Sequence, residues 1–249
     1  MKPDDFEARM RLGECFHSLR VPPGAFIVLR VDGRSFSRLT ERLVEKPFDS
    51  GFHEKMVSTA TALLESLQAT YAYTESDEIS VLLPRAAELF DREVEKLVSI
   101  SAARASATMS LFLGEVVEFD SRLWVGASDA AVVDYFMWRQ ADAARCALNG
   151  WAYWTLRRRD GKSVKAATAM LEGATVAEKN ELLFARGINF NTVPAWQRRG
   201  TGIYWETYEK DGRNPKTGQA VKATRRRVKA NDELPMKDGY ARFVRERIG

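Results

Sequence analysis

The apolar side chains between residues 22 and 127 change their spacing in a fixed order, and this order constrains the fold more than any other feature. The spacing predicts, in chain order, a buried strand at 25–31, a helix from 49 to about 68, a hairpin of strands at 70–73 and 78–83, a helix at 86–113, and a strand pair at 115–119 and 122–126. Strand, helix, strand, strand, helix, strand is the split βαβ arrangement. It predicts an α/β (α+β) fold in which two helices cover one face of an antiparallel sheet.

Helical patterns flank this unit on both sides. Residues 1–20 have helical spacing that stops before two prolines. A long helix is predicted at 129–159, shorter helices near 163–170 and 175–185, then a Gly/Pro/Lys/Arg-rich segment at 200–231 and a polar tail. We therefore divide the chain into a catalytic unit with its N-terminal helix, 1–128, and a helical extension with a basic hairpin and tail, 129–249. The two are expected to pack as one unit.

Composition excludes several kinds of site. The 249 residues include two cysteines, Cys15 and Cys146, and two histidines, His17 and His53, which are too few for a zinc cluster or a disulfide framework. The cysteines are expected to be inert packing residues in a cytoplasmic protein. The N-terminus lacks the apolar stretch of a signal peptide, and no apolar run reaches the roughly 18 residues of a membrane span. Catalysis would therefore rest on carboxylates, lysine and arginine.

Two acidic motifs come at the ends of neighbouring predicted strands. Asp32 follows the strand at 25–31, where Gly33 is expected to turn the backbone sharply and expose its carbonyl and the following amides. Asp77 lies in the hairpin turn, so the topology predicts that it meets Asp32 at one end of the sheet. Two carboxylates and a carbonyl suit Mg²⁺, and two ions about 4 Å apart would serve phosphoryl or nucleotidyl transfer. An ordinary turn and a solvated hairpin tip are the alternative interpretation.

Seven segments of the chain resemble the tRNA-His guanylyltransferase superfamily of 3′-to-5′ polymerases, and more closely its bacterial Thg1-like branch. They are RVDGRSFSRLTE (30–41), EKPFDSGFHEKM (45–56), YTESDEISVLL (73–83), FDSRLWV (119–125), DYFMWRQADAARCALN (134–149), AEKNELLFARGINFN (177–191) and RRGTGIYWE (198–206). They follow the family's order and cover roughly residues 20–206. The resemblance implies a polymerase-like palm, in agreement with the split βαβ order.

The resemblance also implies a role for each matching position. Asp32, the Gly33 carbonyl and Asp77 match the ligands of two Mg²⁺ ions, and Glu78 matches a further acidic, catalytic position. The positions that match the region holding the activating triphosphate, ATP or GTP, are the amides of Gly33, Arg34, Ser35 and Phe36, with Lys46, Asp49 and Ser76. Lys96 and Arg122 match basic positions facing a second triphosphate. The positions expected at nucleotide or RNA are Arg139, Gln140, Lys179 and Asn180, although Arg139 and Gln140 fit a buried polar network equally well.

The reaction implied is growth of an RNA at its 5′ end. In the family a nucleoside triphosphate activates a 5′-monophosphate through a 5′-5′ linkage, and a nucleotide's 3′-hydroxyl then attacks the activated end. Family members assemble as tetramers, so a homotetramer is expected.

One departure from the family pattern bears on the substrate. Where the family has a His-x-Asn element, this chain has Ala144 and Cys146. That departure favours template-dependent repair of truncated tRNA over guanosine addition at −1 of tRNA-His. A nucleotide cyclase would share the palm and its two carboxylates, but a cyclase acts on small substrates and has no use for a basic segment. An inactive tRNA-binding protein is disfavoured because Asp32, Asp77 and Lys46 are all present.

The segment 210–229 carries eight basic residues and one acidic residue. Lys222, Arg225, Arg226 and Arg227 are expected to bind RNA phosphates, with a turn at 215–218 and flanking aromatic residues. A solvated hairpin is the alternative. Trp138, Trp151 and Trp154 recur at helical spacing with Tyr135 and are expected to pack in the core, with base stacking as the alternative. His53 is expected at the surface or facing tRNA.

Overall fold

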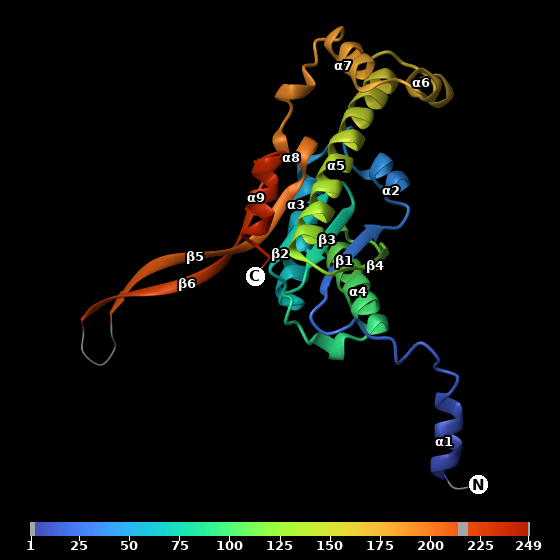
Figure 1. Cartoon of the computed structure of the whole chain (residues 1–249). Helices are drawn as coiled ribbons and strands as arrows, with labels where there is room; N and C mark the ends of the chain where they lie inside the picture. Colours follow the sequence, from blue (N-terminus) through green and yellow to red (C-terminus); the bar gives the residue numbers. More distant parts are fainter. Residues whose placement is uncertain (1–2, 214–218, 249) are drawn as a thin grey trace.

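A computed structural model describes residues 3–213 and 219–248 of the chain and, within them, a six-stranded sheet (Figure 1). The strands lie in the order β4-β1-β3-β2-β5-β6, and every neighbouring pair is antiparallel. They are β1 (Phe26–Gly33), β2 (Tyr71–Glu75), β3 (Glu78–Leu82), β4 (Phe119–Gly126), β5 (Thr201–Arg213) and β6 (Ala220–Asn231). The predicted split βαβ order is confirmed, and β5 and β6 extend the sheet beyond it.

The helices of the described residues are α1 (Pro3–Arg11), α2 (Phe36–Leu43), α3 (Ser50–Ser66), α4 (Val94–Leu113), α5 (Asp129–Arg158), α6 (Val164–Leu171), α7 (Val176–Phe184), α8 (Ala195–Arg199) and α9 (Asp238–Arg245). Short 3₁₀ turns lie at Leu89–Arg92 and Phe190–Thr192. No helix among these is long and apolar enough to cross a bilayer.

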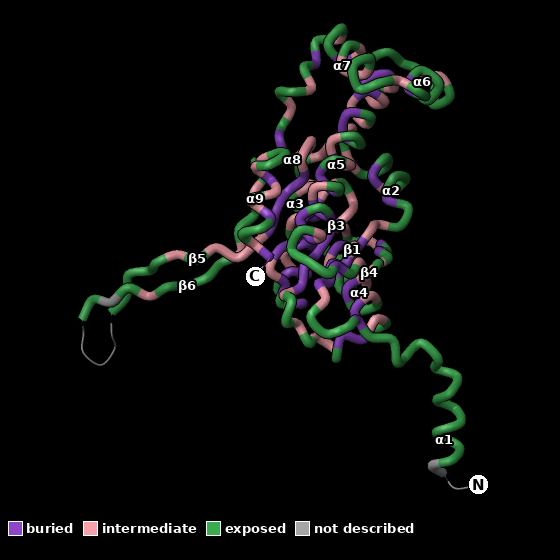
Figure 2. Tube along the Cα trace, in the orientation of Figure 1, coloured by how far each residue is buried: buried purple, intermediate pink, exposed green. Residues whose placement is uncertain are grey.

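The sheet has a helical layer on each face because its strands are apolar on both faces. Ile27, Leu29 and Val31 of β1 pack in the cluster that includes α3 and α4. Phe26 and Val28 point the other way and join the buried faces of α5 and α9. The buried residues therefore concentrate at the sheet, whereas α1 and the far part of the β5–β6 hairpin are exposed (Figure 2).

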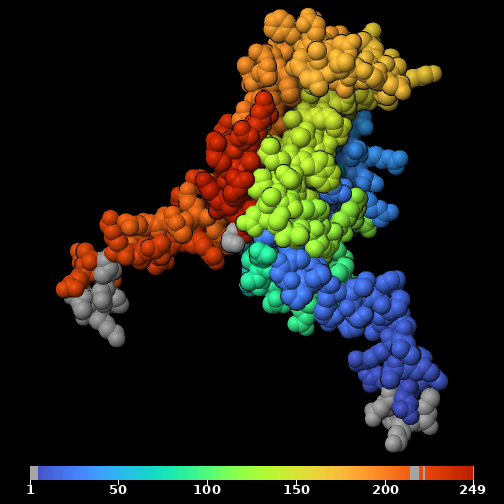
Figure 3. All heavy atoms as spheres, in the orientation of Figure 1, coloured from blue at the N-terminus to red at the C-terminus, as the bar shows by residue number. Residues whose placement is uncertain are grey.

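Helix α5 links the sheet to the rest of the extension. It begins at Ser128, whose side chain accepts a hydrogen bond from the Ala131 amide, and it runs past the sheet to carry α6 and α7 (Figure 1). The space-filling view shows α1 and the hairpin extending away from the body (Figure 3). Functional side chains are therefore presented on the central sheet and on two projections, the α6–α7 end of α5 and the β5–β6 hairpin (Figure 1).

Several predicted elements were wrong in their extent. The predicted N-terminal helix ends at Arg11, and its apolar residues Phe6, Met10 and Phe16 are exposed because no core lies beside them. The predicted strand at 115–119 is absent, and β4 begins at Phe119. The hairpin turn is shorter than predicted, since Thr74 and Glu75 belong to β2.

The predicted helix at 86–113 begins only at Val94, because the chain before it forms a strap held by Arg92. Three residues of the strap, 90–92, have positive φ angles. The buried Arg92 guanidinium donates hydrogen bonds to the carbonyls of Val21, Pro22, Ala25 and Ala87. These bonds fix the strap against the segment that precedes β1.

Other differences concern segments predicted to be irregular or buried. The loop after Asp32 contains α2, and the polar tail contains α9, whose Tyr240 and Val244 are buried. Both cysteines are exposed, so the prediction that they pack in the core was wrong. The predicted turn at 215–218 lies outside the described residues.

Candidate active site

Asp32 and Asp77 come together where β1 ends beside the β2–β3 turn. The Gly33 amide donates a 3.1 Å hydrogen bond to the Asp77 carbonyl, and Asp32 pairs in register with Glu78. Burial raises the pKa of Asp77, and the nearby charge of Asp32 raises it further. This is the meeting that the split βαβ topology predicts. We refer to Asp32 and Asp77 as the acid pair.

The acid pair has few partners among the described residues. The Asp32 carboxylate makes no hydrogen bond or ion pair with any of them. Asp77 accepts one side-chain hydrogen bond, at 2.9 Å from the Ser76 hydroxyl. Two acidic groups that repel each other, with most of their oxygen lone pairs unused, form a site that favours a cation.

The backbone after Asp32 turns at Ser35 and not at Gly33. Gly33 is still part of β1, whereas Ser35 has a φ of 60° and begins α2. Gly33 is needed for space, since a Cβ there would lie 2.5 Å from the Phe36 ring. The expectation of a sharp turn at the glycine was therefore wrong by two residues.

The predicted cradle of four amides is reduced to two. The amides of Gly33 and Arg34 donate to the carbonyls of Asp77 and Glu118, and the Arg34 guanidinium pairs with the Glu118 carboxylate at 2.7 Å. The amides of Ser35 and Phe36 have no partner among the described residues. They lie at the start of α2, where orphan amides attract anions.

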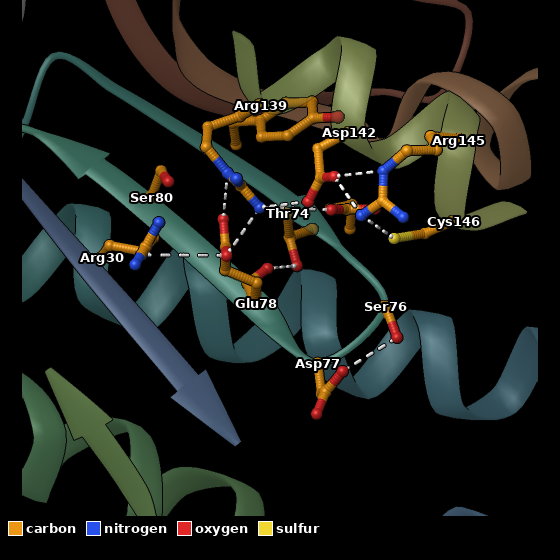
Figure 4. A network of polar contacts seen from close by, with 12 residues as sticks. Arg30, Thr74, Ser76, Asp77, Glu78, Ser80, Arg139, Asp142, Arg145 and Cys146 are labelled. Carbon is orange, nitrogen blue, oxygen red and sulfur yellow. Dashed lines mark hydrogen bonds and ion pairs between the residues drawn. The ribbon is translucent and has the colours of Figure 1, made fainter. Parts of the chain in front are cut away.

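Glu78 points away from Asp77 and into a buried network beneath α5 (Figure 4). The Arg139 guanidinium binds both Glu78 oxygens, at 2.7 and 2.8 Å, and contacts Asp142 at 3.1 Å. Its distance to the Glu75 carboxylate is 3.6 Å. Arg139 thus neutralises the Glu78 carboxylate. The geometry therefore favours a structural role for Glu78 over the predicted catalytic role beside Asp32 and Asp77.

The same burial corrects the prediction that Arg139 and Gln140 bind RNA. Arg139 lies among carboxylates, and the Gln140 amide donates to the Pro235 carbonyl at 3.0 Å; both side chains are buried. The sequence allowed either a contact with nucleotide or RNA or a buried polar network for Arg139 and Gln140, and the structure has the buried polar network. Burial also raises the pKa of Glu78 against the effect of Arg139, and raises that of Glu75 to about 8.

A cavity of about 360 Å³ opens beside the acid pair, between α2, α3, the β2–β3 turn, the far half of α5, and α8. Four predicted nucleotide-binding residues line it together with Asp77: Phe36, Lys46, Asp49 and Ser76. The Lys46 ammonium donates a hydrogen bond to the Thr40 hydroxyl, and burial lowers its pKa while Asp77 opposes that change. The cavity therefore has a cation at the edge of the acid pair.

Asp49 has a structural task in this wall. Its carboxylate accepts hydrogen bonds from the Phe52 amide at 2.7 Å and the Glu45 amide at 3.3 Å, so it caps α3. The start that the sequence predicts for this helix, at residue 49, is confirmed. Because both oxygens are occupied, Asp49 shapes the cavity more than it offers a contact to a phosphate.

Aromatic residues form the rest of the cavity wall, and sequence reasoning missed them. Trp154, Trp196 and Phe48 line it, with the Lys46 ammonium 5.7 Å from the Trp154 ring. The prediction of a core position for Trp154 was wrong, because helical spacing does not distinguish a core face from a cavity wall. His53 also lines the cavity, stacked on Trp196 with centroids 4.1 Å apart and 3.1 Å from Asp232.

Arg122 and Lys96, the two predicted contacts of a second triphosphate, lie apart. Arg122 pairs in register with Arg30 on β1 and is exposed on the edge strand of the sheet. Lys96 lies in the first turn of α4 and pairs with Glu93 at 3.1 Å. The backbone at the start of α4 is hydrogen-bonded to residues 19–20, which precede β1. Lys96 is therefore near the N-terminal end of β1, whereas Asp32 is near its C-terminal end. Within one chain only Arg122 is near the acid pair.

The predicted RNA contacts lie on the projections. Lys179 and Asn180 are on α7, at the far end of α5 (Figure 1). Arg225, Arg226 and Arg227 are exposed on β6. Two of the basic residues of β6 are already paired with carboxylates, since Glu206 on β5 binds Arg227 at 2.7 Å and Glu209 binds Lys222 at 3.0 Å. Arg227 is the register partner of Glu206, whereas Lys222 lies two residues from Thr224, the register partner of Glu209.

Comparisons with known proteins agree with this geometry. Two family models match consecutive parts of the chain, that of tRNAHis guanylyltransferase over residues 7–135 and that of the Thg1 C terminal domain over residues 130–238. The chain belongs to the tRNAHis guanylyltransferase family. The resemblance in the sequence is thereby confirmed, and members of this family are nucleotidyltransferases.

Individual relatives are distant but extensive matches. The tRNA(His) guanylyltransferase of Debaryomyces hansenii is 31% identical over 226 residues, which are 85% of each chain. The probable enzyme of Mus musculus is 31% identical over 199 residues, 75% of this chain and 67% of the mouse protein. A bacterial guanylyltransferase-like protein in complex with GTP superposes with a TM-score of 0.77 at 25% identity, covering 98% of this chain and 99% of that one. A bacterial guanylyltransferase-like protein in complex with ATP superposes with a TM-score of 0.74.

Proposed function

We propose that the protein is a Mg²⁺-dependent nucleotidyltransferase that adds nucleotides to the 5′ end of tRNA in the 3′-to-5′ direction, in template-dependent repair. The observation that carries this proposal is the acid pair, which no described lysine or arginine binds, bordered by a cavity that contains Lys46 and aromatic rings. Family membership supports nucleotide addition to tRNA 5′ ends.

The residues fit Mg²⁺. Asp32 and Asp77 offer oxygen atoms that no described side chain neutralises in an ion pair, and hard oxygen ligands are those that Mg²⁺ prefers. The Gly33 carbonyl is the third ligand that we assign. When bound, two such ions would stabilise the charge that develops in nucleotidyl transfer. Glu78, held by Arg139, has the supporting task of fixing the strand beside Asp77.

The activating ATP or GTP is proposed to bind in the cavity. Its phosphates would contact the Lys46 ammonium and the unpaired amides of Ser35 and Phe36. The ammonium carries a positive charge and the amides carry partial positive charges, so both attract phosphate. Its base would lie against the aromatic wall. Lys46 thus neutralises phosphate charge while the acid pair lies at the reacting end.

Template-dependent repair is favoured over guanosine addition to tRNA-His by two side chains on α5. Ala144 has no polar side-chain atom, and Cys146, beside Arg145, cannot replace an asparagine amide as both donor and acceptor. Neither can supply the contacts of the family's His-x-Asn element. The acid pair and the cavity do not depend on these two positions.

Binding of tRNA is assigned to the projections, where Lys179, Arg225 and Arg226 have no acidic partner among the described residues. Asn180 lies beside Lys179, and its side-chain amide donates a hydrogen bond to the Val176 carbonyl at 2.8 Å. We further propose a homotetramer, so that one tRNA reaches several chains, and a functional division at residue 128 between catalytic and RNA-binding parts. A cytoplasmic location suits the two unpaired cysteines.

The test is extension of a 5′-truncated tRNA carrying a 5′-monophosphate, with Mg²⁺ and nucleoside triphosphates. The wild-type protein should form a 5′-5′ linked intermediate and then lengthen the RNA at its 5′ end. Asp32→Asn and Asp77→Asn should lose both steps, while Asp134→Asn, an exposed carboxylate elsewhere on α5, should keep them. Near-normal extension by either acid-pair variant, correctly folded, would overturn the assignment.

A further inference from the structure

Trp138 is an exposed aromatic side chain next to Arg30, which precedes Asp32 by two residues on β1, although the sequence predicts a core residue at this position. Its exposed fraction is 52%, in contrast to the neighbouring Tyr135, which is buried. Tryptophan combines a large apolar surface with a ring that stacks, and an exposed one beside a catalytic site is a candidate ligand contact. The cavity described above does not include it.

The ring of Trp138 is held in a fixed orientation. The Arg139 guanidinium lies 4.6 Å from its centroid and that of Arg30 lies 5.6 Å away. Tyr135 packs against it edge-on at 5.8 Å. Arg139 is itself fixed by Glu78 and Asp142, so the exposed ring is supported by a rigid network and not by a flexible surface.

The position of the ring relates it to the transfer site. Arg30 precedes Asp32 by two residues on β1, and side chains two apart in a strand share a face. Arg122 is the register partner of Arg30 on β4 and lies on that same face. Trp138 therefore lies on the side of the acid pair that carries Arg122, while Lys46 and the cavity border the other side.

Transfer of a nucleotide needs two groups on opposite sides of the reacting phosphorus, because the entering and leaving oxygens are in line. If the activating nucleotide occupies the cavity, the nucleotide that supplies the attacking hydroxyl must approach from the other side. A stacking surface there would suit any base, since every base has a π face. Such tolerance is what template-dependent addition needs, because pairing and not the protein selects the base.

We propose that Trp138 is the stacking platform for the base of the nucleoside triphosphate that is added, with Arg122 near its phosphates. The inference rests on the proposed function and names a contact of its second step. Arg30 and Arg139 are positioning residues that hold the ring.

The experiment separates the two steps. The second step is measured alone on tRNA with a preformed 5′-adenylylated end, as single-turnover addition across a series of GTP concentrations. The first step is measured as adenylylation of 5′-monophosphate tRNA by ATP. Trp138→Ala should raise the GTP concentration for half-maximal addition by about five- to 150-fold, the range for loss of a stacking aromatic. Adenylylation should change less than about twofold.

Matched variants distinguish stacking from packing. Trp138→Phe should recover most of the affinity, whereas Trp138→Leu, which keeps apolar bulk without a π face, should not. Phe112→Ala truncates another half-exposed aromatic, on α4, and should leave both steps unchanged. A base-less ribose triphosphate, used as a competitive inhibitor of addition, should bind wild-type protein and Trp138→Ala equally.

Three results would overturn the inference. Unchanged GTP dependence in Trp138→Ala would show that the ring contacts no base. An equal loss in both steps, or a change in mass by light scattering, would assign Trp138 to folding or to an interface between subunits. Failure of the wild-type protein to lengthen the adenylylated tRNA would instead refute the proposed function, and this inference with it.

Discussion

Glu75 is a buried carboxyl group whose replacement by glutamine should stabilise the protein, increasingly so as the pH rises. Burial raises its pKa from an ordinary 4.5 to about 8, and the neighbouring Glu78 adds to this while Arg139 opposes it. Below pH 4.5 the group is protonated in both the folded and the unfolded chain. Above pH 8 it is charged in both, and the folded state then holds a buried carboxylate.

The magnitude follows from the two pKa values. Because the pKa of Glu75 is higher in the folded chain than in the unfolded chain, the protonated group stabilises the fold. This stabilisation is fully present below the pKa of the unfolded chain and is lost as the pH rises to the pKa of the folded chain. At about 1.4 kcal/mol per tenfold change in proton affinity, the loss between pH 4.5 and 8 is of order 5 kcal/mol. The amide of Glu75→Gln stays neutral, so the variant escapes this loss.

The assay is thermal unfolding of wild-type protein and Glu75→Gln between pH 5 and pH 9, in Mg²⁺-free buffer. The two melting temperatures should lie close together at pH 5, and that of the variant should be about 10–20 °C higher at pH 9. Glu209→Gln, an exposed carboxylate that pairs with Lys222, is the control and should follow the wild-type pH dependence. Parallel curves for wild-type protein and Glu75→Gln across this range would refute the reasoning.

Three further predictions concern the network, the hairpin and the substrate. Arg139→Met should lower the free energy of unfolding by about 3–5 kcal/mol at pH 8 and by less at pH 5, because it removes the guanidinium that binds both Glu78 oxygens and leaves only Arg30, 3.9 Å away, to pair with Glu78. Equal losses in denaturant titrations at the two pH values would contradict this. Neutralising Arg225 and Arg226 together should reduce the salt dependence of tRNA binding by about two in slope, whereas Arg227→Gln should change it little because Glu206 already pairs with Arg227. An affinity series across salt concentrations tests that difference, and equal effects would argue against it. In one tube, truncated tRNA should be extended faster than full-length tRNA-His, and preferred guanosine addition opposite A73 would reverse this expectation.

The central part of the fold and the acid pair could be predicted because they depend on local patterns and one connection rule. The continuous apolar run of β1 and the helical spacing of α3 identify both elements, and the split βαβ topology then brings Asp32 to Asp77. Asp49 as a helix cap is a similarly local signal. Each of these inferences needs only neighbouring residues and the order of the elements.

The remaining features depend on contacts between distant residues. Helix α4 starts late because Arg92 binds carbonyls about 70 positions earlier in the chain. Trp138 and Trp154 share a helix and a helical spacing with core residues, yet one is exposed beside the acid pair and the other lines the cavity. The pairing of Arg227 with Glu206 follows from the hairpin register, which the basic composition of the segment does not reveal.

Template-dependent growth at the 5′ end is the central claim, and changing the template tests it most directly. A set of four truncated tRNAs would differ only in the nucleotide opposite the missing 5′ position, and each would be incubated with Mg²⁺ and all four triphosphates. The nucleotide added at the 5′ end would then be identified by sequencing. The account predicts that the added nucleotide is the complement of the template in each case. Addition of the same nucleotide to all four tRNAs, or growth at the 3′ end, would contradict it.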